Sequence, residues 1–381
     1  MKIDPLFGWQ SLAPLVALAT VSLAACASSP AGMEGTGGAT VGTGGIGTGG
    51  VMGTGGAAAT CPIPCVVNGH PIAPGGYYVD GNKVYDDKGQ VHVFKGVARP
   101  SLEWSVAGER LNAADYALMK QWGSNVVRLA LNQDFWLKGA AQTNLLYPTT
   151  VDKQIQWAKA AGLDVILDLH WSDRGNLAMA PPANNGNSQQ DMADLNSLQF
   201  WKEIADRYKE DGRITFELYN EPKDISWSVW KNGGQVNGFM AVGMQQLYDA
   251  IRATGADNLV IIGGVHWGYD LSGVPANKIT GYNIMYATHP YDTGDKQMGD
   301  WERAFGFLTS TDPVIMTEFG SLSASCPTSY TQQVVTYIKS KGLSFTGWAW
   351  YVGGCAFPSL ITDWNGTASA AGAIVKQALA N

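Results

Sequence analysis

Short apolar segments of strand type alternate with helical segments along most of the chain, and this alternation constrains the fold more than any other feature. The predicted strands are residues 93–97, 125–129, 164–169, 214–222, 259–263, 284–287, 313–320 and 344–350. The predicted helices are residues 113–122, 151–161, 195–208, 239–253, 301–308, 330–341 and 370–380, with only a weak helical signal at 271–279. Strands that are nearly all followed by a helix predict an α/β fold in which a parallel sheet closes into a (β/α)8 TIM barrel. A doubly wound open sheet is disfavoured, because no G-x-G-x-x-G turn follows the first strand.

A short antiparallel element precedes the barrel. Residues 77–97 contain two turn signals, D-G-N and D-K-G, between segments of alternating polarity. This pattern predicts a β-hairpin or meander that leads into the first barrel strand.

Two of the predicted strands end in a glutamate. Residues 214–222 read I-T-F-E-L-Y-N-E-P, and Pro222 must end that strand because proline cannot continue a ladder. Residues 313–320 read P-V-I-M-T-E-F-G, so Glu318 stands at a second strand end, as Glu221 does at the first. Paired carboxylates of this kind are what a glycosidase uses, one to donate a proton and one to attack the anomeric carbon. The alternative is that each glutamate merely caps a strand at the solvent edge.

Glu217 lies four residues before Glu221 on the same strand face, but deeper in the predicted barrel. A buried carboxylate must be paired. We therefore expect Glu217 to be an internal, hydrogen-bonded carboxylate rather than a catalytic group.

Polar or aromatic residues stand at most of the other strand ends. They are Arg128, His170, Trp171, Asn220, His266, Trp267, His289, Tyr291, Trp348, Trp350 and Tyr351. Catalytic groups of this barrel come from the carboxyl ends of the strands. A single histidine there is more often structural, but six or seven such strand ends are hard to explain by packing.

These strand ends resemble glycoside hydrolase family 5, the retaining β-glycanases of clan A. The resemblance covers about residues 90–370 and rests on N-V-V-R-L, I-L-D-L-H, L-Y-N-E-P, H-P-Y, T-E-F-G and G-W-A-W. It implies that Glu221 is the acid/base and Glu318 is the nucleophile. Beside the nucleophile it implies the guanidinium of Arg128 and the phenol of Tyr291, and beside the acid/base it implies His289. For sugar binding it implies Asn220 as the ligand of the 2-hydroxyl, His170 as a polar group of a subsite, and Trp350 as the ring under the sugar. Trp348 and Tyr351 compete with Trp350 for that last role.

The proposed chemistry requires opposite protonation states at the two glutamates. Glu318 must be ionised to attack, and the cation of Arg128 and the phenol of Tyr291 should favour that state. Glu221 must be protonated, so it needs a drier position and a negative neighbour, which Glu318 supplies.

The composition favours a carbohydrate substrate. The chain has 14 Trp and 15 Tyr, although for any one Trp core packing is the better assumption. Its net charge of -7 and its lack of a basic stripe argue against nucleic acid as a partner. We expect a monomeric endo-β-1,4-glucanase acting on a plant-type polysaccharide without a cofactor, with residues 99–104, Trp171, Trp267 and Trp301 along an open cleft. The alternatives are a β-mannanase, xylanase or xyloglucanase, or a non-catalytic carbohydrate-binding lipoprotein.

The N-terminal part of the chain is expected to direct export. Residues 1–25 read as a lipoprotein-type signal peptide ending L-A-A-C, which makes Cys26 the predicted lipidated residue. Ordinary signal-peptidase cleavage is the alternative. Residues 26–60 repeat G-T-G-G and predict a flexible linker, so the catalytic domain comprises residues 61–381. We expect a secreted or envelope-bound protein that reaches the membrane only through the lipid anchor.

The other four cysteines predict disulfides, because an even number in an exported chain is typical of them. Three pairings are possible. Proximity in sequence favours Cys61–Cys65, and Cys326–Cys355 would join the loops after the last two strands. No Cys-His cluster accompanies these residues, so we expect no metal site.

Overall fold

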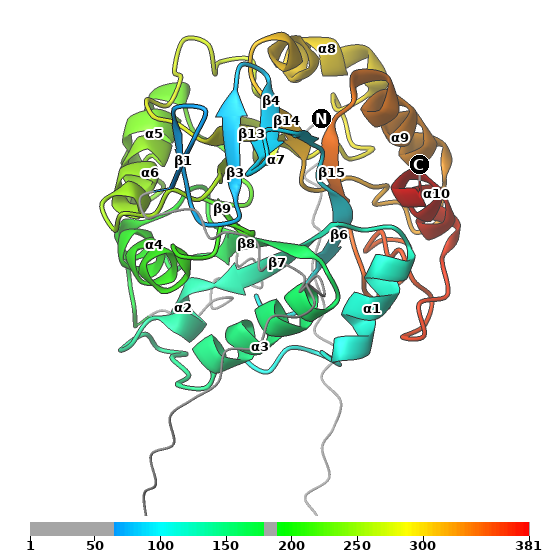
Figure 1. Ribbon diagram of the computed structural model, residues 1–381, viewed down its shortest axis with the longest axis horizontal. Helices are drawn as coiled ribbons and strands as arrows, with labels where there is room; N and C mark the ends of the chain where they lie inside the picture. The colour runs from blue at the N-terminus through cyan, green and yellow to red at the C-terminus, as the bar shows by residue number, and fades with distance from the viewer. Residues whose placement is uncertain (1–64, 179–188, 381) are drawn as a thin grey trace, which may run out of the picture. The chain divides into compact units, whose positions relative to one another are not determined.

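Eight parallel strands close into a barrel, in the order β12-β13-β14-β15-β6-β7-β8-β9 (Figure 1). The computed structural model describes residues 65–178 and 189–380. The barrel strands are β6 (Lys95–Arg99), β7 (Val126–Asn132), β8 (Asp164–Trp171), β9 (Ile214–Glu217), β12 (Val260–Gly263), β13 (Ile284–Thr288), β14 (Val314–Met316) and β15 (Ser344–Gly347). The predicted (β/α)8 barrel is confirmed. The predictions of a signal peptide, of Cys26 as a lipidated residue and of a linker lie outside the described residues.

The barrel strands are apolar on both faces because helices cover the outside and side chains fill the inside. All residues of β7 are buried, Arg128 included. A separate interior cluster takes Val126, Ile166, Ile261 and Ile315 from four different strands. Phe94, immediately before β6, belongs to the same cluster and lies at the amino end of the barrel.

Helices surround the barrel in Figure 1. They are α1 (Ala113–Gln121), α2 (Gln133–Trp136), α3 (Tyr147–Ala160), α4 (Leu195–Tyr208), α5 (Trp227–Asn232), α6 (Met244–Arg252), α7 (Val265–Gly268), α8 (Trp301–Ala304), α9 (Ser329–Lys341) and α10 (Ala370–Ala380), with 3-10 turns η1 (Met298–Asp300) and η2 (Gly306–Ser310). Side chains cap the amino ends of α1, α2, α4 and α5. The carboxylate of Asp194, for example, caps α4 in a capping box with Ser197. Over the described ranges, none of these helices has the length and apolar character to cross a membrane.

The predicted helix 239–253 is wrong over its first residues. Phe239–Ala241 forms strand β11, which pairs antiparallel with β10 (Gly234–Val236) through a turn at Gly238. The helix itself begins only at Met244. The predicted helix 301–308 is likewise only partly helical, since α8 ends at Ala304 and η2 follows.

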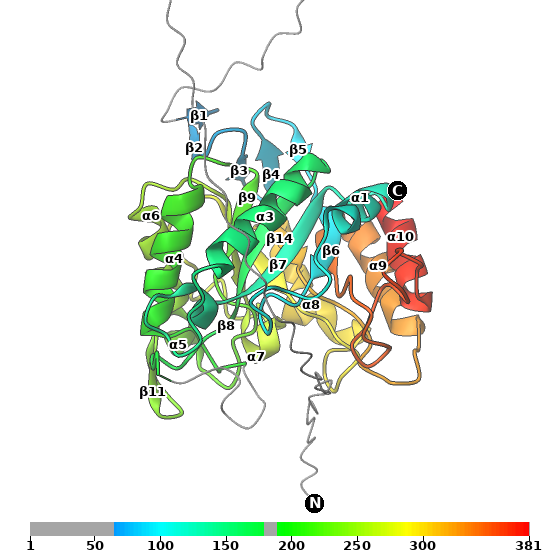
Figure 2. The same cartoon turned by 90° about the horizontal axis from the view of Figure 1, so that it is seen from below.

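Antiparallel strands cover the amino end of the barrel. The predicted meander is present as β3 (Tyr77–Asp80), β4 (Lys83–Asp86) and β5 (Val91–His92), and an additional pair, β1 (Cys65–Val67) and β2 (His70–Ile72), precedes it. The hydroxyl of Tyr77 donates to Asp164, the first residue of β8. Figure 2 shows β1 to β5 at one end of the strands and α7 and β11 at the opposite end. The strands β1 to β5 therefore do not cover the carboxyl ends of the barrel strands, where a site can form.

Candidate active site

The guanidinium of Arg128 is the centre of the strand-end residues. It projects from β7, is fully buried, and joins side chains of three other strands or strand ends. Its Nε lies 2.6 Å from Glu217 Oε2, its Nη1 2.7 Å from Glu318 Oε1, and its Nη2 2.6 Å from Asn220 Oδ1. Asp168 Oδ2 of β8 lies 3.0 Å from the same Nη2. One rigid cation thus fixes the positions of two glutamates, one aspartate and one amide relative to each other.

Glu217 is the internal, paired carboxylate that was predicted. Besides Arg128, it accepts a hydrogen bond from Thr317 Oγ1 at 2.7 Å. Burial disfavours its ionised form, but the charges and hydrogen bonds of Arg128 and His289 outweigh burial and lower the pKa of Glu217 to about 2. Glu217 is therefore a permanent anion inside the barrel.

Glu318 follows β14 and is held on both carboxylate oxygens. Arg128 donates to Oε1, and the Tyr291 hydroxyl donates to Oε2 at 2.7 Å. Burial, together with the nearby charges of Glu318 and Glu221, raises the pKa of Tyr291 well above its usual range. The phenol therefore keeps its proton, and the Glu318 carboxylate is oriented by two donors.

Glu221 is paired with His289, whose Nδ1 lies 3.0 Å from Glu221 Oε1. Burial raises the pKa of Glu221, but the hydrogen bond and charge of His289 outweigh burial, and the net shift is downward. Burial lowers the pKa of His289, yet the surrounding Glu318, Glu217 and Glu221 raise it to about 9. These two shifts run against the expectation that Glu221 alone holds the proton in the resting site, because His289 beside it also accepts protons strongly.

The two predicted catalytic carboxylates are close together. One oxygen of Glu221, one of Glu318 and one nitrogen of His289 all lie within 4.8 Å of one another. This spacing would admit a metal ion, but both nitrogens of His289 already lie at hydrogen-bond distance from Glu221 and Thr317. The raised pKa of His289 also disfavours a metal ion, because an imidazole must give up its proton to become a ligand. We therefore assign this cluster to acid–base chemistry.

Asn220 and His170 form the next layer of polar groups. The Asn220 Nδ2 atom lies 3.3 Å from His170 Nε2, and His170 Nδ1 lies 2.6 Å from Asp168 Oδ2. The Asn220 amide is thus fixed on its oxygen by Arg128 and lies beside an imidazole on its nitrogen. The predicted role of Asn220 as the ligand of the sugar 2-hydroxyl stays a prediction.

The prediction that Trp350 lies under the sugar is wrong. Trp350 is fully buried and packs edge-on against Trp122, the residue that follows α1, with ring centroids 4.8 Å apart. Trp348 instead lies nearly parallel to the His170 ring, with centroids 5.6 Å apart. The reason is that β15 ends at Gly347, so the two-residue alternation of a strand does not continue through the G-W-A-W motif.

The remaining tryptophans of the predicted cleft divide into two groups. Trp301 is fully buried and packs against Phe305, so its expected place in the cleft is wrong. Trp267 is partly exposed, with the Lys223 Nζ atom 4.7 Å above its ring. Trp171 is partly buried, and its ring centroid lies 6.5 Å from that of Trp104.

Several side chains near the site were not found from the sequence. Glu109 accepts hydrogen bonds from Trp104 Nε1 at 3.0 Å and from the hydroxyl of Tyr351, but it stands in a loop without any motif. Thr317 lies between Glu217 and His289, and the only signal for it was its place before Glu318 in T-E-F-G.

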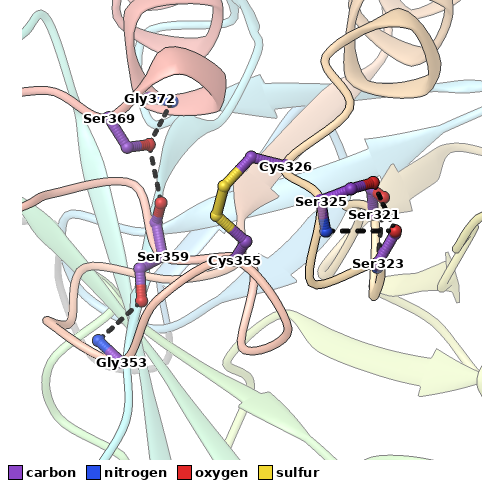
Figure 3. The surroundings of a disulfide bond; sticks show 9 residues. All are labelled: Ser321, Ser323, Ser325, Cys326, Gly353, Cys355, Ser359, Ser369 and Gly372. Carbon is purple, nitrogen blue, oxygen red and sulfur yellow. Dashed lines mark hydrogen bonds between the residues drawn. A yellow bond between two sulfur atoms is a disulfide. The ribbon is translucent and has the colours of Figure 1, made fainter.

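Cys326 and Cys355 lie in the loops after β14 and β15, and Figure 3 shows them joined. Their Cα atoms are 5.0 Å apart, a separation that a disulfide allows. The pairing stays a prediction that chemistry must test. For the other predicted pair, Cys61 lies outside the described residues, and Cys65 is buried in β1.

A family model described as cellulase, glycosyl hydrolase family 5, matches residues 85–354. Among curated proteins, the chain is 26% identical over 280 residues to endoglucanase Z of Dickeya dadantii, covering 71% of this chain and 58% of that protein. It is 25% identical over 329 residues to an endoglucanase of Paenibacillus polymyxa, covering 72% of this chain and 79% of that protein. An endoglucanase of Clostridium saccharobutylicum is matched over 56% of its length. The chain thus spans little more than half of two of these relatives.

Solved structures show the same likeness. The β-glucanase SdGluc5_26A from Saccharophagus degradans superposes with a TM-score of 0.66 at 26% identity, covering 80% of this chain and 93% of that one. The same β-glucanase in complex with cellotetraose gives a TM-score of 0.65. The catalytic domain of a Thermobifida fusca endoglucanase, at 20% identity and a TM-score of 0.63, shares the fold.

Proposed function

Because the chain belongs to glycosyl hydrolase family 5, we propose that it is an endo-β-1,4-glucanase that works with retention of configuration. The observation that carries this proposal is the separation of the two strand-end carboxylates, whose nearest oxygens lie within 4.8 Å of each other. Retaining enzymes hold their carboxyl groups about 5–5.5 Å apart, whereas inverting enzymes need roughly 6.5–9.5 Å to admit a water. The similarity of the chain to several endoglucanases supports the proposal that its substrate is a β-1,4-glucan.

In this proposal Glu318 is the nucleophile. Arg128 and Tyr291 hold its two oxygens and keep the carboxylate pointed at the reacting carbon. Attack forms a covalent bond between a Glu318 oxygen and the anomeric carbon while the bond to the leaving sugar oxygen breaks. Glu221 delivers a proton to that oxygen, and the Glu221–His289 pair is the source of the proton.

The second half of the reaction reverses these roles. Glu221, now without the proton, accepts one from a water whose oxygen attacks the anomeric carbon. The bond to Glu318 breaks, and the sugar leaves with its original β configuration. Asn220 is placed to bind the 2-hydroxyl, a contact that strengthens in the transition state.

Aromatic rings supply the sugar-binding surface in this proposal. Trp348 and His170 stack beside the catalytic residues, and Trp104 and Trp171 extend the aromatic surface beyond them. Trp267 is partly exposed and lies just after β12, the strand that follows Glu221 in the barrel. Such rings match the apolar faces of a β-1,4-linked chain, and the β-glucan proposal follows from them together with the endoglucanase relatives.

The experiment is a reducing-end assay on carboxymethylcellulose, mannan, xylan and xyloglucan with the wild type and Glu318→Gln. We expect the highest wild-type activity on the glucan, and a loss of about 10³-fold or more in the variant because the nucleophile is gone. Glu210→Gln is the matched control, since Glu210 is exposed at the end of α4. A wild type that prefers another glycan would reassign the substrate. Near-normal activity of Glu318→Gln would overturn the mechanism, and a wild type inactive on every glycan would favour a carbohydrate-binding lipoprotein.

We also propose that the protein is exported, anchored through a lipid on Cys26 and tethered by residues 26–60. The support is the L-A-A-C sequence behind an apolar segment and the G-T-G-G repeats that follow it. We propose that it acts as a monomer, since the residues assigned to the reaction all lie in one barrel.

A further inference from the structure

A short chain of hydrogen-bonding groups lies behind Glu221 and ends at the buried anion Glu217. His289 Nδ1 lies 3.0 Å from Glu221 Oε1, and His289 Nε2 lies 2.8 Å from Thr317 Oγ1. The Thr317 hydroxyl donates to Glu217 Oε1 at 2.7 Å. We propose that Thr317 is a positioning residue that holds His289 in its Nε2–H form, so that Glu221 and His289 share a single transferable proton. This inference rests on the proposed role of Glu221 as acid/base.

The direction of each hydrogen bond follows from Glu217. Its Oε2 is bound to Arg128 Nε at 2.6 Å, and as an ionised carboxylate it can only accept. The Thr317 hydroxyl has one proton and gives it to Glu217 Oε1, so its oxygen is left as an acceptor toward His289. His289 Nε2 must therefore carry a hydrogen.

With Nε2 protonated, the contact between His289 Nδ1 and Glu221 needs one further proton. Either Glu221 carries it and donates to Nδ1, or Nδ1 carries it and donates to the Glu221 carboxylate. The opposite neutral form of His289, with its hydrogen on Nδ1, would satisfy the Glu221 carboxylate with no proton to spare. Thr317 excludes that form, because its oxygen would then face a bare Nε2 with its only proton already given to Glu217.

Over one complete reaction, the Glu221–His289 pair gives up one proton and takes one back. In the first step the shared proton moves to the glycosidic oxygen, the bond to the leaving sugar breaks, and Glu318 bonds to the anomeric carbon. The Glu221 carboxylate then faces the bare Nδ1 of His289, an arrangement without a hydrogen bond that favours proton uptake. In the second step water gives its proton to Glu221, its oxygen bonds to the anomeric carbon, and Glu318 is released.

The surrounding structure keeps these groups in place. His289 and Thr317 are fully buried, and a Cβ added to Gly268 would come within 3.0 Å of His289 Nδ1, so main chain packs against the ring. The hydroxyl of Thr346 donates to the Thr317 carbonyl at 2.6 Å. The charged or titratable groups that act on the Glu221–His289 pair from the elements around it are Glu217, Glu318, Asp168, His170, Tyr291 and Lys296. Arg128 acts through its ion pairs with Glu217 and Glu318. None of them is replaced in a Thr317 variant, and of these groups Glu217 is the one that loses its hydrogen bond from Thr317 when valine stands there.

The first test compares pH profiles of kcat/KM on a soluble β-1,4-glucan for the wild type, Thr317→Val and Thr317→Ser. Valine has the shape of threonine but offers no acceptor to Nε2–H, so the charged form of His289 loses a hydrogen bond. We expect the alkaline limb of Thr317→Val to move down by about one pH unit, with activity at the acidic end within about threefold of wild type. Thr317→Ser should restore the wild-type limb. An unmoved limb in Thr317→Val, or an equal loss at every pH that serine does not rescue, would overturn the proposal.

The second test needs no substrate, so it can fail independently of the proposed function. The chain has five histidines, and ¹⁵N-histidine labelling with a His289→Gln reference assigns the His289 signals. Above the titration of His289, we expect the wild-type ring to carry its hydrogen on Nε2 and the Thr317→Val ring to carry it on Nδ1. A wild-type ring with its hydrogen on Nδ1 would contradict the inference, whatever the enzyme cleaves.

Discussion

Replacing Arg128 by methionine should destabilise the fold strongly, and the destabilisation should depend on pH. Arg128 is fully buried, and its loss leaves Glu217, Asp168 and Glu318 without their shared cation. Breaking one buried ion pair costs about 3–5 kcal/mol. For Glu217 alone, a pKa lowered from 4.5 to about 2 corresponds to about 3 kcal/mol of stabilisation of its ionised form in the folded state.

The sign of the pH dependence follows from that depressed pKa. Glu217 contributes its stabilisation fully above its unfolded pKa near 4.5 and loses it as the pH falls through about 2. Without Arg128 the buried carboxylates of the variant can protonate instead, and protonation relieves the repulsion between them. The stability difference between wild type and Arg128→Met should therefore be largest at neutral pH and should shrink toward pH 3.

Urea unfolding followed by tryptophan fluorescence at pH 7, 5 and 3.5 measures this difference by linear extrapolation. Arg303→Met is the control, because the Arg303 side chain is 79% exposed and, among the described residues, forms an ion pair with Asp300 three residues before it. Its loss should cost less than about 1 kcal/mol at every pH. If Arg128→Met costs as little at pH 7, or costs the same at all three values, the account of Arg128 as a shared counter-charge is refuted. A variant that folds only in acid would support it.

Three other parts of the account can be tested separately. Trp348→Ala should lower kcat/KM on glucan about tenfold or more, whereas Trp350→Phe should mainly lower the melting temperature; the reverse pattern would restore Trp350 as the sugar-binding ring. Mass mapping of a non-reduced digest should find a Cys326–Cys355 cross-link, whose loss costs about 3 kcal/mol in the chain-entropy model; free thiols at both positions would exclude it. A protein that begins at residue 61 should keep full activity on soluble substrate and lose membrane association, and a large loss of activity would show that the removed segment packs on the barrel.

The barrel could be predicted because burial on both faces gives its strands an unmistakable pattern. In β7 every residue is buried, and the sequence there is apolar apart from Arg128 and Asn132. Once the strands are known, parallel pairing puts their carboxyl ends at one rim. The convergence of Glu221 and Glu318 then follows without knowledge of any distance.

What the sequence could not predict depends on where the regular pattern stops. The alternation that would have placed Trp350 ends with β15 at Gly347. The apolar residues of β11 resemble the start of a helix in sequence, and the hairpin that they form instead depends on a left-handed turn at Gly238. The proton shared by Glu221 and His289 depends on a 3.0 Å contact between loops 68 residues apart, which no local pattern specifies.

In the proposed mechanism, Glu221 protonates the leaving oxygen of the glycosidic bond and Glu318 attacks the anomeric carbon of the same bond. The most direct measurement is proton NMR of the first-formed product of β-1,4-glucan oligosaccharide hydrolysis, recorded before mutarotation. One carboxylate oxygen of Glu221 and one of Glu318 lie within 4.8 Å of each other, and closely spaced carboxyl groups favour direct attack by Glu318 over attack by a water between them. The account predicts that the β-anomer appears first, formed through a covalent bond to Glu318. An α-anomer appearing first would contradict it, even if both glutamates proved essential.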